Sequence, residues 1–215
     1  MSSGFRHTVV AVVAALALAA GFCGAAFAAG GTSARSNGAA LQMCTGKYAL
    51  CDAAACTPIP EQHGYPGAPT VKPSHALCEC VVEDGKNLGP GPCSERVPRG
   101  KNGEYILSTY SYALNKPFLT CPQGGDRTVC FGYPCIIDQH DPHDPQRVQR
   151  AHCTCPITYG SAEFKTQGGD CNVASCSNGL WQGGTPKEYE VINKKFTKAT
   201  GEKAPPDCAA VVKKP

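Results

Sequence analysis

The sequence predicts a small, disulfide-rich, mainly β fold made of two tandem six-cysteine modules with one C-terminal helix. Three observations lead to this prediction. The 215-residue chain carries 15 cysteines but few aliphatic and aromatic core formers. Most of these cysteines form two sets with nearly constant spacing. Short segments rich in Val, Ile, Tyr or Leu lie between Gly, Pro, Asn and Asp, a pattern typical of strands.

The segment 1–28 is typical of a secretory signal peptide. Charged residues precede an apolar run from Val9 to Ala20, and a small-x-small sequence ends at Ala28. We therefore expect residues 1–28 to be removed, residues 29–40 to form a flexible leader, and the rest to have no membrane span. An uncleaved anchor stays open as the alternative, because the uncharged stretch from Val9 is just long enough to cross a bilayer.

The remaining chain contains too few apolar residues to stabilise a fold by burial alone. From Ala29 onward, 28 of 187 residues are Leu, Ile, Val or Phe, which is below the roughly 20 % associated with ordinary folded domains. The same segment has 14 cysteines, an even number that allows up to seven disulfides. Each would stabilise the fold by roughly 2–4 kcal/mol. Disulfides persist in oxidising compartments, so we expect a secreted protein of the periplasm or the extracellular space.

The cysteine spacing predicts an internal repeat. Two sets recur at a nearly constant offset along the chain, and they are Cys44, Cys51, Cys56, Cys78, Cys80 and Cys93, then Cys121, Cys130, Cys135, Cys153, Cys155 and Cys171. We therefore expect modules over 41–115 and 118–208, with the same pairing in both. Six cysteines allow 15 pairings, and the spacing does not choose among them. Cys176 and Cys208 have no counterpart, so we expect them to pair with each other.

Strands are expected over Tyr48–Cys51, Ala76–Val82 and Tyr105–Leu114, with a loop from Asn87 to Lys101. In an extended strand, Cys78 and Cys80 point to the same face, as do Cys153 and Cys155. Pairing within a Cys-x-Cys would strain an extended strand, so the partners of these cysteines are expected elsewhere.

The helix is expected over residues 186–199. Thr185 and Glu188 have capping-box spacing, with Pro186 at the first helical position. Tyr189, Ile192 and Phe196 then recur on one helix face, and Gly201 marks the end.

The cysteine pattern Tyr48-Ala-Leu-Cys51, Ala55-Cys56-Thr-Pro-Ile-Pro60 and Cys78-x-Cys80, followed by a second Cys-x-Cys, resembles a family of exported, cysteine-rich proteobacterial proteins. The resemblance covers most of the chain after residue 28. It implies an exported protein and carries no activity or catalytic residue.

Metal binding is the alternative functional hypothesis. Reduced Cys-x-Cys thiolates suit copper or zinc, and His75 and His152 lie near the two pairs. The second module adds His140, Asp141 and His143 in an acidic loop. An even cysteine count in an oxidising compartment favours disulfides instead, so we expect no metal and no cofactor.

Other chemistries lack their motifs. The sequence has no Cys-x-x-Cys, no Gly-x-Ser-x-Gly, no His-Glu-x-x-His and no phosphate-binding Gly-rich loop. A net charge of +3 is too small and dispersed to indicate nucleic-acid binding. We therefore expect a non-catalytic binding or interaction protein with an unknown protein or glycan partner. Tyr105, Tyr110, Tyr112 and Trp181 are either contact residues for that partner or part of the small core.

Overall fold

The computed structural model describes residues 40–52, 54–61, 72–138, 148–167 and 171–208. The strands are β1 Leu41–Leu50, β2 Ala55–Pro58, β3 His75–Pro90, β4 Tyr105–Leu107, β5 Phe118–Cys121, β6 Gly125–Thr128, β7 Pro134–Ile137, β8 Arg150–Ser161, β9 Phe164–Gln167 and β10 Leu180–Gln182. The helices are the short 3-10 turns η1 Cys93–Glu95 and η2 Val173–Ser177 and the α-helix α1 Pro186–Thr200. The predicted mainly β fold with a C-terminal helix is confirmed.

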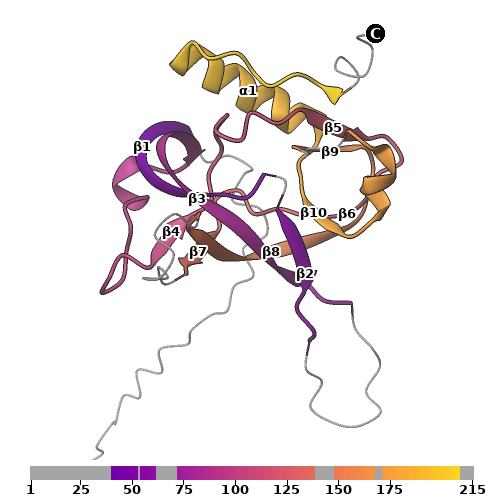
Figure 1. Cartoon of the computed structure of the whole chain (residues 1–215), viewed down its shortest axis with the longest axis horizontal. Helices are drawn as coiled ribbons and strands as arrows, with labels where there is room; N and C mark the ends of the chain where they lie inside the picture. Colours follow the sequence, from indigo (N-terminus) through magenta and orange to yellow (C-terminus); the bar gives the residue numbers. More distant parts are fainter. Residues whose placement is uncertain (1–39, 53, 62–71, 139–147, 168–170, 209–215) are drawn as a thin grey trace, which may run out of the picture. The chain divides into compact units, whose positions relative to one another are not determined.

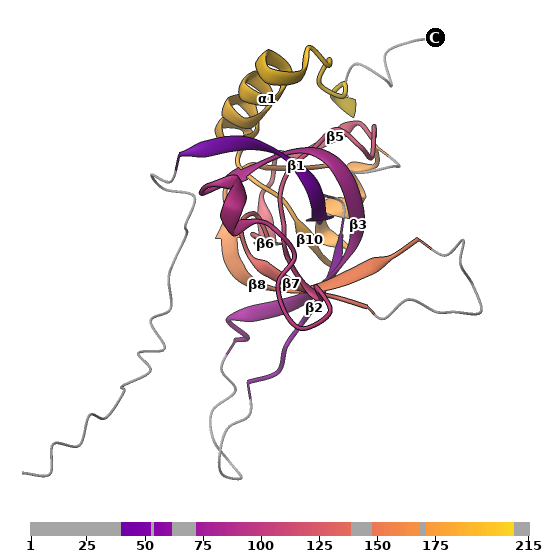
Figure 2. The same ribbon diagram turned by 90° about the vertical axis from the view of Figure 1, so that its left-hand side faces the viewer.

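The main sheet has eight strands in the order β1-β3-β2-β10-β6-β8-β7-β4, and β3 also pairs with β8. The long strands β3 and β8 run through its middle, as Figure 1 shows. A second sheet contains β5 and β9. Helix α1 lies on the side of β5 and β9, away from β2, β4 and β7 (Figures 1 and 2).

One strand pair in residues 41–107 and one in residues 118–182 have the same cysteine arrangement. Strand β2 pairs antiparallel with β3, with Cys56 opposite Cys78, and β7 pairs antiparallel with β8, with Cys135 opposite Cys153. The final strand of each half, however, pairs with the other half: β4 with β7, and β10 with β2. Both halves therefore contribute to one sheet, and the module boundaries at 115 and 118 stay a prediction.

All 14 cysteines after residue 28 form disulfides. The pairs are Cys44–Cys93, Cys51–Cys80, Cys56–Cys78, Cys121–Cys176, Cys130–Cys155, Cys135–Cys153 and Cys171–Cys208. Seven disulfides make this a disulfide-stabilised protein suited to an oxidising compartment.

The predicted Cys176–Cys208 pair is wrong. Cys121 pairs with Cys176, and Cys171 pairs with Cys208. Cys176 lies in the turn η2, just as Cys93, the partner of Cys44, lies in η1. Cys176 is thus the counterpart of Cys93, and extra residues before η2 displace it from the common offset.

The segment Tyr105–Leu114 is a strand only over its first three residues. After β4, the backbone of Tyr110 exchanges hydrogen bonds with Leu88 of β3 instead of continuing along β7. Tyr105 is 46 % exposed, whereas Tyr110 and Tyr112 are buried. The predicted loop Asn87–Lys101 also begins later than expected, because β3 extends to Pro90.

Sulfur replaces much of the aliphatic core. One cluster of buried residues consists mainly of cysteines and alanines, with the Sγ atoms of Cys51 and Cys153 only 3.4 Å apart. A second cluster is aromatic and lies under α1; it contains Leu88, Tyr110, Tyr112, Phe118, Tyr189 and Phe196. The scarcity of Leu, Ile and Val is therefore offset by disulfides on one side and by rings on the other.

Helix α1 begins and ends as the sequence predicts. Thr185 Oγ1 accepts a hydrogen bond from the Glu188 N–H, and the Glu188 carboxylate accepts one from the Thr185 N–H. Gly201 ends the helix with φ of 76°, a left-handed conformation that glycine adopts without strain. The cap fixes the first turn of α1, from which Tyr189 points into the aromatic cluster.

The predicted signal peptide 1–28 lies outside the described residues, as does the leader apart from residue 40. Among the residues that are described, no helix has the length and apolar character needed to cross a membrane.

Candidate functional site

A cavity of about 320 Å³ lies beside the first two turns of α1. Its walls come from five parts of the chain: the two ends of β1, the segment after β4, the segment after β6, the end of β10 and α1 itself. Apolar side chains dominate the walls, and they include Leu41, Tyr110, Val129, Phe131, Tyr189 and Ile192. This volume is at the lower end of the range of small-molecule sites.

A buried acidic side chain, that of Asp52, lines this mainly apolar cavity. It follows Cys51, whose disulfide to Cys80 anchors the end of β1 to β3. The residue is 7 % exposed, and its Oδ1 accepts a hydrogen bond from the Tyr189 hydroxyl at 3.0 Å. Burial raises the pKa of Asp52 to about 7, although the Tyr189 hydrogen bond lowers it. Among the described residues, no Lys, Arg or His forms an ion pair with this carboxyl.

Two tyrosine rings stand beside the carboxyl. The rings of Tyr110 and Tyr189 are 6.0 Å apart at 62°, in an edge-on arrangement. The Tyr110 hydroxyl donates to Asn193 Oδ1 at 2.6 Å, which fixes its ring against α1. Burial is the largest cause that raises the pKa of both hydroxyls, and the Asp52 charge raises both further. Both tyrosines therefore stay protonated, and Tyr189 remains a hydrogen-bond donor to Asp52.

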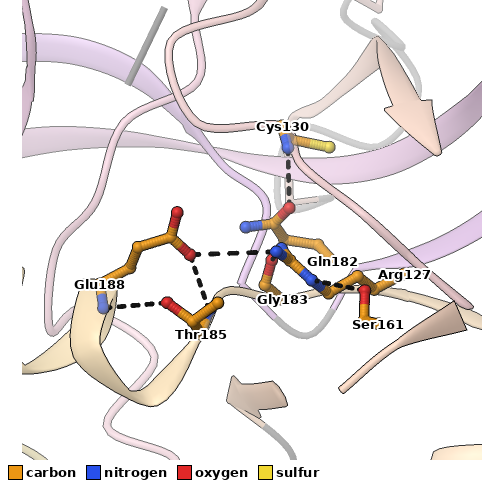
Figure 3. A network of polar contacts seen from close by, with 7 residues as sticks. All are labelled: Arg127, Cys130, Ser161, Gln182, Gly183, Thr185 and Glu188. Carbon is orange, nitrogen blue, oxygen red and sulfur yellow. Dashed lines mark hydrogen bonds and ion pairs between the residues drawn. The ribbon is translucent and has the colours of Figure 1, made fainter. Parts of the chain in front are cut away.

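A polar network holds the N-terminus of α1 against β6 and β8 (Figure 3). The guanidinium of Arg127, 7 % exposed, donates to the Gly183 carbonyl at 2.6 Å and to Ser161 Oγ at 3.2 Å. Its third nitrogen lies 4.0 Å from the Glu188 carboxylate. Because Glu188 also caps the helix through Thr185, the first turn of α1 is tied to the sheet at one edge of the cavity.

Gln182 lines the cavity beside this network. Its Oε1 accepts a hydrogen bond from the Cys130 N–H at 2.7 Å (Figure 3), and its carbonyl accepts one from Thr166 Oγ1. Thr109, another lining residue, has a buried hydroxyl without a hydrogen-bond partner in the described part of the chain.

The cysteines of the metal hypothesis are all oxidised. Cys78 and Cys80 pair with Cys56 and Cys51, and Cys153 and Cys155 pair with Cys135 and Cys130. Two groups of three sulfur atoms do lie close together. One group is Cys51, Cys80 and Cys153, and the other is Cys56, Cys78 and Cys130. A metal ion binds thiolates, and a disulfide sulfur carries no such charge. The hypothesis that Cys-x-Cys binds copper or zinc is therefore wrong for the oxidised protein.

The two candidate histidines that the structure describes, His75 and His152, have different partners. His75 Nδ1 contacts Ser74 Oγ on the exposed end of β3. His152 Nδ1 lies 2.7 Å from Asp138 Oδ1, on the opposite strand face from Cys153. His140, Asp141 and His143 lie outside the described residues.

Sequence reasoning missed Asp52. The signal is a lone acid in an apolar stretch, Cys51 to Cys56, where nothing else is polar. Tyr110, which the sequence leaves open between a partner contact and the core, and Tyr189, which it places on one helix face, both line the cavity.

Comparisons of this chain with protein-family models, with curated proteins and with solved structures gave no match.

Proposed function

We propose that this protein is an exported, non-catalytic binding protein that holds a small, mainly apolar ligand in the cavity beside α1. One observation carries the proposal: a cavity of about 320 Å³ has mainly apolar walls and a buried carboxyl, that of Asp52. A concave apolar site with few, fixed polar groups is the usual form of a small-molecule site.

The walls of this cavity are held in place by covalent and capping interactions. The Cys51–Cys80 disulfide fixes the residue before Asp52, and the Cys130–Cys155 disulfide fixes the residue between Val129 and Phe131. The capping box fixes the residue before Tyr189. A preorganised site loses little conformational entropy when a ligand binds, which favours a binding role.

Export supports the same role. Seven disulfides suit the periplasm or the extracellular space, residues 1–28 have the pattern of a signal peptide, and the cysteine pattern resembles exported proteins. A protein that resists unfolding there can expose a binding cavity for long periods.

Ligand-observed NMR with a panel of small apolar alcohols, amines and acids tests the proposal. The oxidised protein is compared with Ile192→Trp and Leu41→Trp, which place an indole in the cavity, and with Val148→Trp as a control at a 58 % exposed position. We expect saturation transfer to at least one class of compound for the wild type and Val148→Trp. Both cavity-filling variants should lose it. Equal signals from all four proteins, or none from the wild type, would overturn the proposal.

A further inference from the structure

We propose that the ligand is a small organic amine, whose ammonium group pairs with the Asp52 carboxylate while its apolar part fills the cavity. This inference rests on the proposed function and names the chemical class of its ligand. It starts from a buried acid that has no positive partner among the described residues.

The first argument is charge. A buried carboxylate is stable when it is paired, and within the described residues the Asp52 carboxyl has only the neutral Tyr189 hydroxyl as a hydrogen-bond partner, at 3.0 Å. The pKa of Asp52 is raised for the same reason: burial disfavours the charged carboxylate, and no described cation lies beside it to offset this effect. An ammonium group in the cavity supplies the missing charge and up to three hydrogen-bond donors.

The nearby charged and titratable groups do not supply it. On α1, Lys187 is exposed at the cavity rim and Glu188 is acidic. On β6, Arg127 is already held by Gly183, Ser161 and Glu188. Burial raises the pKa of the Tyr48, Tyr110 and Tyr189 hydroxyls, and the charge of Asp52 raises the pKa of each further. Apart from Lys187, which is exposed at the rim, the described groups around Asp52 are neutral, acidic or already paired, and this favours a cationic ligand.

The second argument is the aromatic wall. Tyr110 and Tyr189 line the cavity next to Asp52, and an ammonium group is attracted to the face of an aromatic ring. Leu41, Val129 and Ile192 offer apolar surface for the rest of the ligand. An amine on a short aromatic or aliphatic body matches this combination of a buried acid, two rings and apolar walls.

Binding is coupled to a proton. Where Asp52 is protonated, its carboxyl proton leaves to solvent as the ammonium group forms the ion pair, so one proton is released for each amine bound. Only the ionised carboxylate pairs with the ammonium group. The affinity for the amine should therefore rise with pH. With a pKa of about 7, binding at pH 5.5 should be about 30-fold weaker than at pH 8.5.

Isothermal titration calorimetry with 2-phenylethylamine and 2-phenylethanol, which differ in the charged group, tests the inference. The proteins are the wild type, Asp52→Asn, and Asp84→Asn as a control at an exposed acid on β3. At pH 8.5 we expect the wild type and Asp84→Asn to bind the amine at least 10-fold more tightly than the alcohol. Asp52→Asn should lose that preference. Repeating the titration of the wild type at pH 5.5 tests the role of Asp52 without a substitution, because the affinity for the amine should fall there.

The outcomes separate the two proposals. If the alcohol or 3-phenylpropionate binds the wild type as tightly as the amine, the cavity is a binding site but the amine assignment is wrong. If amine affinity does not change between pH 5.5 and 8.5, Asp52 is not the partner. If none of the three compounds binds and the wider NMR panel also fails, the proposed function itself is wrong.

Discussion

Cys78 and Cys153 lie directly opposite each other where β3 pairs antiparallel with β8. Each is the first cysteine of a Cys-x-Cys, and each forms a disulfide with the cysteine opposite it on a further neighbouring strand, Cys56 of β2 or Cys135 of β7. Four adjacent strands, β2, β3, β8 and β7, therefore carry one row of cysteines. Disulfides join β2 to β3 and β7 to β8 along this row.

Removing an inner disulfide should cost more than removing an outer one of similar span. Cys51–Cys80 closes 29 residues and Cys171–Cys208 closes 37, so chain entropy predicts nearly equal losses of about 3–4 kcal/mol for the two Cys→Ala pairs. Cys51 and Cys80 also belong to the sulfur core, so their replacement should cost about 2 kcal/mol more. Urea unfolding of the two double variants measures the difference, and equal losses would show that core packing contributes nothing.

The free energy of unfolding should fall as pH rises through the titration of Asp52. Its pKa is about 7 in the folded protein and 3.8 when unperturbed, so the folded state holds the extra proton between these values. The contribution of Asp52 to stability is therefore complete below about pH 4, and about 4 kcal/mol of it is lost as pH rises from there through 7 and the buried carboxyl ionises. Asp52→Asn should remove this dependence, matching the wild type at pH 4 and exceeding its stability at pH 8. Thermal unfolding from pH 4 to 8 tests this, and parallel curves for the two proteins would contradict it.

Thr109→Val should stabilise the protein by about 1 kcal/mol. The Thr109 hydroxyl is buried and finds no hydrogen-bond partner in the described segments, so replacing it with a methyl group removes an unpaired polar atom. Thr166→Val is the matched contrast, because Thr166 Oγ1 donates to the Gln182 carbonyl at 2.7 Å. The free energy of unfolding of Thr166→Val should be lower than that of the wild type by about 1–2 kcal/mol. The opposite signs are measured by chemical unfolding, and a loss in both would contradict the interpretation.

The cap of α1 should matter for both stability and binding. Thr185→Ala removes the acceptor of the Glu188 N–H and should cost about 1 kcal/mol. Because Tyr189 and Ile192 line the cavity from the first turns of this helix, ligand affinity should also fall. Thr185→Ser keeps the acceptor and should preserve both. If Thr185→Ala destabilises the helix without weakening binding, α1 does not position the cavity wall.

Local features were predictable from the sequence, whereas the partners of distant strands were not. The helix bounded by Thr185 and Gly201 follows from capping and spacing within that short segment. The cavity has walls from five separate segments, and Asp52 acquires its role only when Tyr189, 137 residues away, reaches it. No local pattern encodes such a meeting. The wrong partner for Cys176 has another cause, because extra residues before η2 displace this cysteine from the common offset.

The exchange of the last strands between the two halves sets the order in which the sheet can be completed. Strand β2 lies near the start of the described chain, yet one of its two neighbours is β10, near the end. Strand β4 likewise pairs with β7 of the second half. A nascent chain that has produced only the first half leaves one edge of β2 without its β10 partner and β4 without its β7 partner. Exposed edges of this kind recruit other strands. The second half covers these edges with β10 and β7, so completing the sheet within one chain removes the sites at which two unfinished copies would pair.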